Sequence, residues 1–264
     1  MPKDDSASKN QRAQKILQEL LRDGRVSVES LSKRLKISPA TVRRELTELE
    51  RTGLLRRTHG GAIRVEPMLY EPFRHVSSFG AQEQQHAAEK RRIGLAAAEI
   101  VQDGDIIAIG AGTTTTQVAR SIRHRKGITV VTNAVNIAME LSHQADLKVI
   151  VSGGTLSGDW FALTGPVAIA AVGEMFVDTA FIGVDGIHPE YGLTTNYPDQ
   201  ASVHRAMMRQ ARQRIVVADH TKIGDIGTAL IGAVSDVNLI ITDKGISPKI
   251  AAQFAAKKIE VRKV

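Results

Sequence analysis

Apolar residues recur at a helical spacing in the first fifty positions. Ile16, Leu17, Leu20 and Leu21 form a stripe that predicts a helix over residues 11–23. The glycine that follows this stretch is a usual helix stop. The chain therefore opens with an amphipathic helix.

Two further helices are predicted directly after the first. Val28, Leu31 and Leu35 fall on one face of a short helix, and Lys-Ile then turns the chain. Ser38 can cap the next helix, and Pro39 suits its first position because a missing N–H would be unpaired there anyway. This spacing predicts a helix-turn-helix.

The third helix has one apolar face and one face suited to DNA. Its inward stripe is Val42, Leu46 and Leu49. Small residues at its start can approach base edges in the major groove, and arginines one turn later can reach guanine or phosphate. The candidate DNA contacts are Ser38, Pro39, Ala40, Thr41, Arg43, Arg44 and Thr47. An ordinary helical hairpin with solvated arginines is the alternative.

A basic hairpin follows. Two short extended runs surround a Gly-Gly pair in residues 54–64, and Gly53 is placed to end the preceding helix near residue 51. Three helices and a hairpin predict a winged helix. Arg56, Arg57 and His59 are candidates for contacts with backbone phosphates, which position a domain without specifying sequence. For Arg57 and His59, plain solvent exposure is an equal alternative.

The pattern changes after residue 104 to short β-branched runs that alternate with helices. The runs are 106–109, 128–132, 147–152, 179–184, 214–218, 237–242 and 259–264. The helical stretches are 114–123, 136–143, 200–212 and 248–257, and a long helix is expected before them over 81–102. Near-continuous apolar strands alternating with helices predict an α/β domain whose largely parallel sheet is covered on both faces. We predict a winged helix-turn-helix domain over 1–66, a linker over 67–80 and an effector-sensing domain over 81–264.

Polar loops follow the predicted strands, and ligands of parallel sheets bind at the carboxyl ends of strands. Gly110–Thr116 leads into a helix, so its backbone amides and hydroxyls can bind a phosphate. It lacks the Gly-Lys-Ser/Thr of a Walker loop, which disfavours nucleotide hydrolysis. Asp185 can bind sugar hydroxyls, and Lys222 supplies a point charge for a phosphate. Tight turns, helix caps and an exposed cation are the structural alternatives for these residues.

Composition and charge support a two-part chain. The 264 residues are 42% hydrophobic and 24% charged, with no cysteine, which excludes disulfides and thiolate chemistry. Residues 1–66 carry 15 Lys/Arg against 9 Asp/Glu, whereas residues 67–264 carry 20 against 19. A basic head on a near-neutral body is typical of a polyanion-binding module attached to a domain with another task. No run resembles a signal peptide or a membrane span, so we expect a cytoplasmic protein without membrane contact.

These motifs resemble the DeoR family of bacterial transcriptional regulators, mostly repressors of sugar-catabolic operons. The head resembles the family from Val26-Ser27 through Arg43-Arg44-Glu45-Leu46 to the His-Gly-Gly-Ala of the wing. The body resembles it at Gly112-Thr113-Thr114, Val130-Val131-Thr132-Asn133, Gly153-Gly154-Thr155-Leu156, Gly165-Pro166, Gly183-Val184-Asp185-Gly186 and Asp219-His220-Thr221-Lys222.

The resemblance implies a Rossmann-like effector domain similar in fold to ribose-5-phosphate isomerase and CoA transferases. It implies a homo-oligomer that binds double-stranded operator DNA, needs no cofactor or metal, and is controlled by a phosphorylated sugar or related catabolic intermediate. The implied effector contacts are Gly112, Thr113, Thr114, Thr115, Asn133, Gly153, Gly154, Asp185 and Lys222.

The sequence departs from the family pattern at two places. Family members often carry Asp before the Gly-Thr-Thr loop, where this chain has Gly110. A common Asp-Glu-Ala-Glu-Val-Lys-Arg helix has Gln200, Ser202 and His204 here in place of two carboxylates and a lysine. Trp160, in an aromatic pair, can stack on a sugar or fill the core, and the core is the commoner place for a large aromatic.

The sequence thus predicts a repressor of a carbohydrate-catabolism operon and no enzyme. A sugar-phosphate isomerase or transferase carrying a DNA-binding head is the main alternative. It would need a positioned base, for which Asp185 is the one obvious candidate. A constitutive architectural DNA-binding protein is a third possibility, but it leaves the polar loops unexplained.

Overall fold

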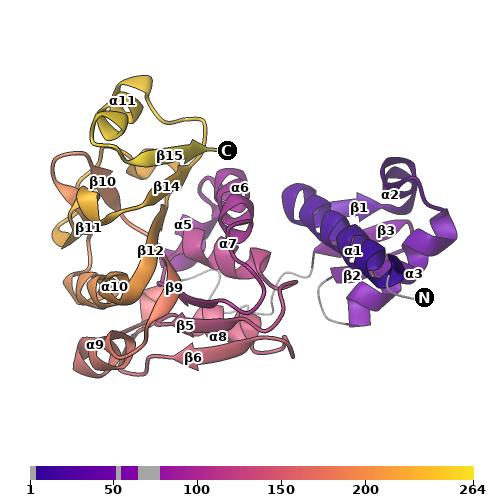
Figure 1. Cartoon of the computed structure of the whole chain (residues 1–264), viewed down its shortest axis with the longest axis horizontal. Coiled ribbons are helices and arrows are strands. Elements are labelled where there is room, and N and C mark those ends of the chain that lie inside the picture. Colours follow the sequence, from indigo (N-terminus) through magenta and orange to yellow (C-terminus); the bar gives the residue numbers. More distant parts are fainter. Residues whose placement is uncertain (1–3, 52–54, 65–77) are drawn as a thin grey trace. The chain divides into compact units, whose positions relative to one another are not determined.

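The computed structural model describes residues 4–51, 55–64 and 78–264 of the chain. They form two compact units, Met1–Met68 and Leu69–Val264, which we call the head and the body (Figure 1). No helix in the described ranges is long and apolar enough to cross a membrane.

Within its described residues, the head contains three helices and a small antiparallel sheet. Its elements are α1 (Asp4–Asp23), β1 (Arg25–Ser27), α2 (Val28–Leu35), α3 (Pro39–Arg51), β2 (Leu55–Thr58) and β3 (Gly61–Arg64). The predicted apolar stripes meet in one core, in which Ile16, Leu31, Val42 and Leu46 are fully buried. The helices predicted from these stripes are therefore confirmed. The first begins seven residues earlier than predicted, and the Gly53 cap lies outside the described residues.

The sequence pattern did not predict β1, which is short. It pairs with β3, so the sheet order is β1-β3-β2. This pairing requires glycine at position 61, because an added Cβ there would lie 1.9 Å from the carbonyl oxygen of Val26. The Gly-Gly pair thus serves both the wing turn and the close approach of two strands.

The body is built on a seven-stranded sheet in which every neighbouring pair is parallel. The strand order is β15-β14-β12-β9-β4-β5-β6. The strands are β4 (Ile106–Ile109), β5 (Thr129–Thr132), β6 (Lys148–Val151), β9 (Val177–Ile182), β12 (Ala211–Val217), β14 (Leu239–Thr242) and β15 (Glu260–Lys263). All seven predicted runs are strands of this one sheet, and the predicted α/β class is confirmed.

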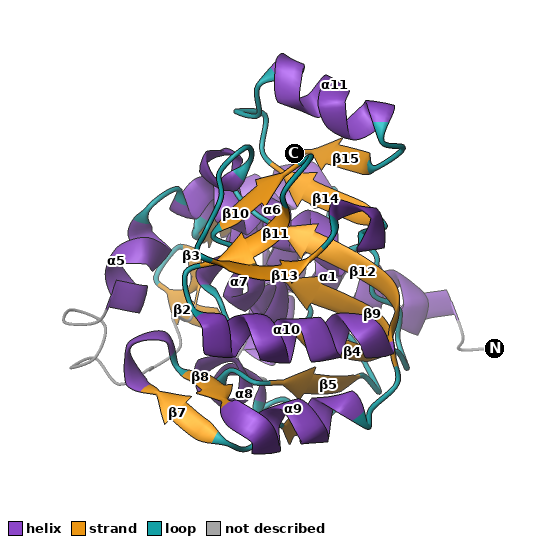
Figure 2. Cartoon of the chain, turned by 90° about the vertical axis from the view of Figure 1, so that its left-hand side faces the viewer, coloured by secondary structure: helices purple, strands orange, loops and turns teal. Residues whose placement is uncertain are grey.

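Helices cover both faces of the sheet, as its doubly apolar strands require. Ile107 and Ile109 of β4 pack into a core shared with α6 (Ala87–Ala98), α7 (Thr113–Ser121) and α8 (Val135–Leu141). Ala108 lies in the opposite core with α9 (Gly165–Gly173), α10 (Pro198–Gln210) and α11 (Pro248–Ala256). Figure 2 shows α9 and α10 lying across this second face.

In residues 78–264 the body also contains three short 3-10 helices and two small antiparallel sheets. The further elements are η1 (Gly158–Trp160), η2 (His220–Lys222), η3 (Val234–Asp236), β7 (Thr155–Ser157), β8 (Ala162–Thr164), β10 (Gly186–His188), β11 (Gly192–Thr195) and β13 (Ala229–Gly232). The sheets have the orders β7-β8 and β10-β11-β13. The periodicity of the sequence predicted neither sheet.

The long helix predicted over 81–102 is wrong. The chain forms α5 (Ser78–Gln84) and α6, separated by His86 in the left-handed region at φ 52°. Ser78, Phe79 and Gly80, which the sequence assigned to the linker, already belong to α5. No glycine or proline marks the break, and contacts described below hold α5 away from the axis of α6.

The strand order reverses direction once, between β4 and β9. From β4 the chain runs outward through β5 and β6, and from β9 it runs outward the other way through β12, β14 and β15. The loops after β4 and β9 therefore separate at a crevice, which is where ligands bind in open parallel sheets.

Candidate functional site

The start of α3 presents an exposed, basic surface. Ser38, Pro39 and Ala40 are exposed, as are Arg43 and Arg44 one turn later. The hydroxyl of Ser38 accepts a hydrogen bond from the backbone N–H of Thr41 at 3.1 Å, which confirms the predicted cap. The helix can therefore present its first turn to a DNA groove.

The wing is attached to α3 by side-chain hydrogen bonds. Arg57 on β2 donates from Nη1 to the hydroxyl of Thr47 at 2.9 Å, and its backbone N–H donates to Glu50 at 2.8 Å. Thr47 in turn donates to the carbonyl oxygen of Arg43. Thr47 thus positions the wing on the helix, while Arg56 and His59 are exposed beside it.

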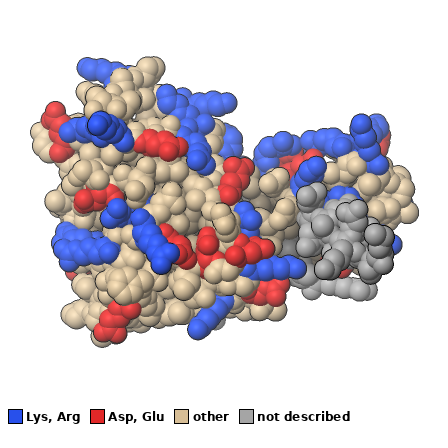
Figure 3. All heavy atoms as spheres, viewed as in Figure 1, with Lys and Arg blue, Asp and Glu red and all other residues tan. Residues whose placement is uncertain are grey.

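Basic residues gather on the head. In the view of Figure 3, Lys and Arg side chains line one edge of the head, while both signs of charge are interspersed over the body. This agrees with the excess of 15 Lys/Arg over 9 Asp/Glu in residues 1–66. Such a surface attracts the phosphate backbone of nucleic acid.

A pocket lies at the reversal point of the body sheet. Its lining residues come from the helices α5, α6, α7 and α10, from η1, from the end of β11 and from the loops after β4, β9, β11 and β12. They are Gln82, Lys90, Ala111, Gly112, Thr113, Thr114, Trp160, Gly183, Val184, Asp185, Thr195, Tyr197, Gln200, His204, Asp219 and Lys222.

One group of lining residues suits an anion. The first amides of α7 have no side-chain cap. The carbonyl oxygen of Gly112 accepts hydrogen bonds from the hydroxyls of Thr115 and Thr116 at 2.9 and 2.7 Å. Free amides at a helix start carry partial positive charge and bind phosphate oxygens.

Two lysines strengthen this electropositive site. The side chain of Lys90 is only 1% exposed, and its ammonium donates to the carbonyl oxygen of Gln82. Burial and the nearby charge of Lys222 together lower the pKa of Lys90 to about 8, and the Asp219 carboxylate opposes this shift. Lys222 lies on η2, which Asp219 caps by accepting from the N–H of Thr221 at 3.1 Å.

The other group of lining residues suits hydroxyls. Oδ2 of Asp185 accepts hydrogen bonds from the hydroxyl of Thr195 at 2.7 Å and from the N–H of Asn196 at 2.8 Å. These bonds fix the carboxylate and leave Oδ1 available to a ligand. The rings of Trp160 and Tyr197, whose centroids are 5.3 Å apart, line the same pocket as Asp185. Burial raises the pKa of the Tyr197 phenol.

Within the described ranges, no cluster of His, Asp and Glu has the makings of a metal site. The groups that the pocket offers to a ligand are ammonium groups, backbone amides, hydroxyls, a carboxylate and aromatic faces.

The comparisons with known proteins agree with this two-part organisation. The DeoR C terminal sensor domain model matches residues 85–244, more than half of the chain, and the DeoR-like helix-turn-helix domain model matches residues 12–68. The chain belongs to the DeoR family. The predicted family, and the winged-head and α/β-body architecture, are thus confirmed.

Relatives named as regulators match most of this DeoR-family chain. The HTH-type transcriptional regulator GlpR of Haloferax volcanii is 38% identical over 84% of each chain. The HTH-type transcriptional repressor GlcR of Bacillus subtilis is 33% identical over 87% of this chain and 86% of that protein. A solved ribose 5-phosphate isomerase A from Methanocaldococcus jannaschii has a TM-score of 0.40 at 18% identity, covering 52% of this chain and 55% of that one. The domain matches and the named relatives favour a DNA-binding regulator with a sensor domain over the enzyme alternative.

Five of the nine effector residues implied by the family resemblance line the pocket, and four do not. Gly112, Thr113, Thr114, Asp185 and Lys222 line it. Thr115 is fully buried, and its hydroxyl is occupied by the carbonyl oxygen of Gly112. The side chain of Asn133 holds the loop after β4 in place. It accepts a hydrogen bond from the N–H of Ala111 at 2.9 Å and donates one to the carbonyl oxygen of Leu163 at 3.1 Å.

Gly153 and Gly154 are absent from the pocket lining for a topological reason. They follow β6, which is the edge strand, two strands away from β4. Gly154 is tightly packed instead, since an added Cβ would lie 2.4 Å from the carbonyl oxygen of Thr164.

Sequence reasoning missed several lining residues of this DeoR-family pocket. Lys90 interrupts an otherwise apolar helical stripe with Ile93 and Ala97, and that interruption was its available signal. Trp160, for which the core was the expected place, is partly buried and lines the pocket. Gln200 and His204, one helical turn apart on α10, line the pocket, whereas Ser202 does not.

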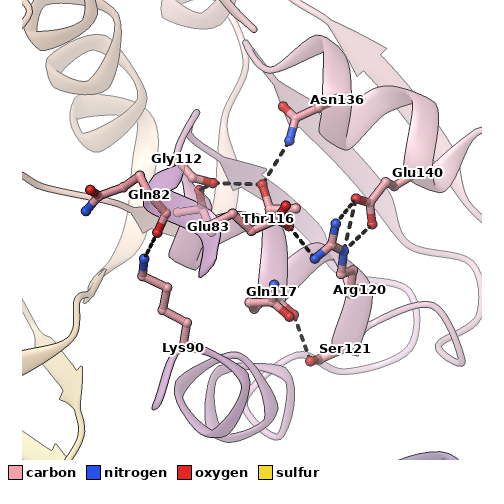
Figure 4. A network of polar contacts seen from close by, with 11 residues as sticks. Gln82, Glu83, Lys90, Gly112, Thr116, Gln117, Arg120, Ser121, Asn136 and Glu140 are labelled. Atoms are coloured by element: carbon pink, nitrogen blue, oxygen red, sulfur yellow. Dashed lines mark hydrogen bonds and ion pairs between the residues drawn. The ribbon is translucent and has the colours of Figure 1, made fainter. Parts of the chain in front are cut away.

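The helix α5 is fixed to the pocket by two buried cations, shown in Figure 4. Arg120 on α7 forms ion pairs with Glu83 of α5 and Glu140 of α8, each at 2.6 Å. Its pKa is raised, because the two carboxylates outweigh the opposing effect of burial. Lys90 binds the last turn of α5 through Gln82. The helix α5 is thus bonded to Lys90, which lines the anion site, and to Arg120 of α7, whose first turn lines it.

Proposed function

We propose that this DeoR-family regulator represses a carbohydrate-catabolism operon in the cytoplasm. A small phosphorylated sugar or related catabolic intermediate binds the pocket and changes the affinity of the head for operator DNA. The observation that carries this proposal is the joint presence of Lys90, Lys222, the first amides of α7 and Asp185 in one pocket of the sensor domain.

The lysine-rich side of the pocket fits a phosphate better than a neutral group. Two ammonium groups repel each other, and the charge of Lys222 accordingly adds to the effect of burial in lowering the pKa of Lys90. With a pKa of about 8, Lys90 still carries its proton at neutral pH. A phosphate dianion would compensate both ammonium groups and accept hydrogen bonds from the amides of Thr113 and Thr114.

The remaining side fits the carbon chain of a sugar. Oδ1 of Asp185 can accept from a hydroxyl, and the rings of Trp160 and Tyr197 offer apolar faces for C–H groups. Asp185 was also the candidate base of the enzyme alternative. We propose that it binds ligand and takes no part in turnover, since both matched domains are those of regulators.

The helix α5 is the proposed route from ligand to head. It is the first described element after residue 77, and both of its charged contacts come from elements that line or support the pocket. A phosphate beside Lys90 competes with the carbonyl oxygen of Gln82 for the ammonium hydrogens and so favours a different placement of α5. A hundredfold change in operator affinity requires a coupling of about 2.7 kcal/mol between the two sites.

DNA recognition is assigned to the exposed side of α3 and to the wing. Arg43 and Arg44 read or anchor the operator together with Ala40 and Thr41, and Arg56, Arg57 and His59 contact backbone phosphates. A homo-oligomer would place at least two heads on repeated half-sites, as paired recognition helices require.

Operator binding measured by fluorescence anisotropy tests the proposal. The DNA comes from upstream of the gene and its neighbours and is titrated at fixed salt, with and without a panel of sugar phosphates. We expect tight binding that at least one phosphosugar changes, which also gives the direction of regulation. Tight binding that no sugar phosphate alters would overturn the sensing half of the proposal. Sedimentation of the same complexes gives the number of chains per operator.

A further inference from the structure

His204 is a buried histidine whose imidazole makes no hydrogen bond to the described residues. It lies on α10, is 1% exposed and lines the pocket. Neither Nδ1 nor Nε2 has a hydrogen-bond partner among the described residues. Burial lowers its pKa to about 4 against a weak opposing effect of Asp185, so the ring is neutral at physiological pH.

A neutral imidazole has one N–H donor and one nitrogen acceptor, and buried polar atoms are almost always paired. Both positions are unused here, and the ring borders a cavity. A molecule in the pocket can supply the missing partner. A hydroxyl suits this ring because it can both donate and accept a hydrogen bond.

The charges around His204 differ from those at the anion site. The charged group that acts on its pKa is the Asp185 carboxylate, whereas Lys90 responds to Lys222, Asp219 and Glu83. A second phosphate or a carboxylate beside His204 would be repelled by the Asp185 carboxylate, which lines the same pocket and acts on the pKa of this ring. A hydroxyl avoids that repulsion and can bridge the imidazole and the carboxylate.

We infer that His204 binds a hydroxyl of the effector and that this end of the pocket selects an uncharged, polyhydroxylated carbon chain. The preferred ligands are then sugar monophosphates, in preference to bisphosphates and phosphorylated sugar acids. This inference rests on the proposed function and specifies the effector class within it.

The single tryptophan of the chain, Trp160, gives a direct readout because it lines the same pocket. Its fluorescence is recorded in the full chain during titration with inorganic phosphate, ribose 5-phosphate, glucose 6-phosphate, fructose 6-phosphate and fructose 1,6-bisphosphate. The test variant is His204→Leu, which keeps most of the volume and removes both nitrogens. His204→Gln keeps a donor and an acceptor, and Thr242→Val is the matched control, because Thr242 also carries a buried, unpartnered polar atom but lies outside the pocket lining.

We expect at least one monophosphate to bind the natural chain, and fructose 6-phosphate to bind more tightly than fructose 1,6-bisphosphate. His204→Leu should weaken monophosphate binding about tenfold or more while leaving inorganic phosphate unaffected. His204→Gln should keep most of the affinity, and Thr242→Val all of it. Melting temperatures recorded without ligand show that each variant folds.

Each contrary result has a distinct meaning. Equal monophosphate affinity in the natural chain and His204→Leu would overturn this inference and leave the proposed effector class standing. If His204→Leu does not fold, a folded His204→Ala variant that binds monophosphates as tightly as the natural chain likewise overturns it. If no phosphorylated ligand changes either Trp160 fluorescence or operator binding, the proposed function fails and the inference fails with it.

Discussion

An added Cβ on Gly110 would lie 2.8 Å from Nε2 of His204. Gly110 follows β4 and His204 lies on α10, so two positions far apart in sequence share one contact. Both are places where the chain departs from the common family pattern, which has Asp at the first and Lys at the second. In this chain the imidazole of His204 occupies the space that a side chain at position 110 would need, so the two departures lie in direct contact.

Gly110→Ala should displace His204 from its position beside the pocket. Crowding of this kind costs about 1–3 kcal/mol of folding stability, and we expect sugar phosphate affinity to fall with it. Urea unfolding and Trp160 fluorescence titrations measure the two effects. Gly173→Ala is the matched control, since a Cβ there meets nothing within 4 Å. Removing the ring as well, in Gly110→Ala/His204→Ala, should recover much of the lost stability, and a purely additive double variant would contradict the contact.

Arg43→Ala and Arg44→Ala should each weaken operator binding. If an arginine contacts a phosphate, its loss also lowers the slope of log affinity against log salt by about 0.9. Anisotropy titrations at several salt concentrations give both quantities. Arg212→Ala removes an exposed arginine of the body, with its side chain 86% exposed, and should leave DNA binding unchanged. Unaltered affinity in both head variants would remove α3 from the proposed DNA interface.

Lys222→Ala should make the regulator insensitive to its effector without impairing DNA binding. The reason is the loss of one of the two ammonium groups proposed to hold the phosphate. Operator anisotropy with and without the active sugar phosphate measures both properties, and Lys249→Ala, which removes an exposed lysine of α11, serves as the control. Equal loss of DNA binding and effector response would show that Lys222 has a structural role instead.

Glu83→Gln should uncouple the effector from the DNA-binding head. It removes one of the two carboxylates that pair with Arg120 but keeps Glu140, which is fully buried against the same guanidinium. We therefore expect the variant to bind operator and sugar phosphate separately, while the sugar phosphate alters operator affinity several-fold less than in the natural chain. Glu89→Gln, whose partner Arg92 is exposed, is the control. An unchanged response in Glu83→Gln would exclude this ion pair from the coupling route.

Acid should destabilise the body through His204. Its pKa is about 4 when folded against 6.5 for the free side chain, so the unfolded chain binds the extra proton between these values. The stability present above pH 6.5 is then lost as the pH falls toward 4, by about 2 kcal/mol at pH 5. His204→Leu should lack this contribution, which denaturation curves at pH 7 and pH 5 can measure. Parallel pH dependence in the two proteins would contradict it.

The sequence by itself determined the three described helices of the head and the strands of the main sheet. Helical spacing of Leu31, Val42 and Leu46 and the cap at Ser38 are local patterns, and local backbone geometry follows from them. The seven β-branched runs likewise identified the strands of the main sheet. Such patterns predict structure because the spacing of apolar residues shows which face of a single helix or strand packs against the core.

Tertiary structure alone decided the composition of the pocket. The strand order put β4 beside β9 and sent β6 to the edge, so Gly153 and Gly154 ended far from the lining that Asp185 joins. At the break between α5 and α6, Lys90 and Arg120 contact α5. No glycine or proline in the sequence marks this break. The role proposed for His204 depends on its contact with Gly110 and on its place in the pocket lining, and only the folded chain shows both. These relationships join residues tens of positions apart, and a periodic pattern carries no information on which distant loops the folded sheet brings together.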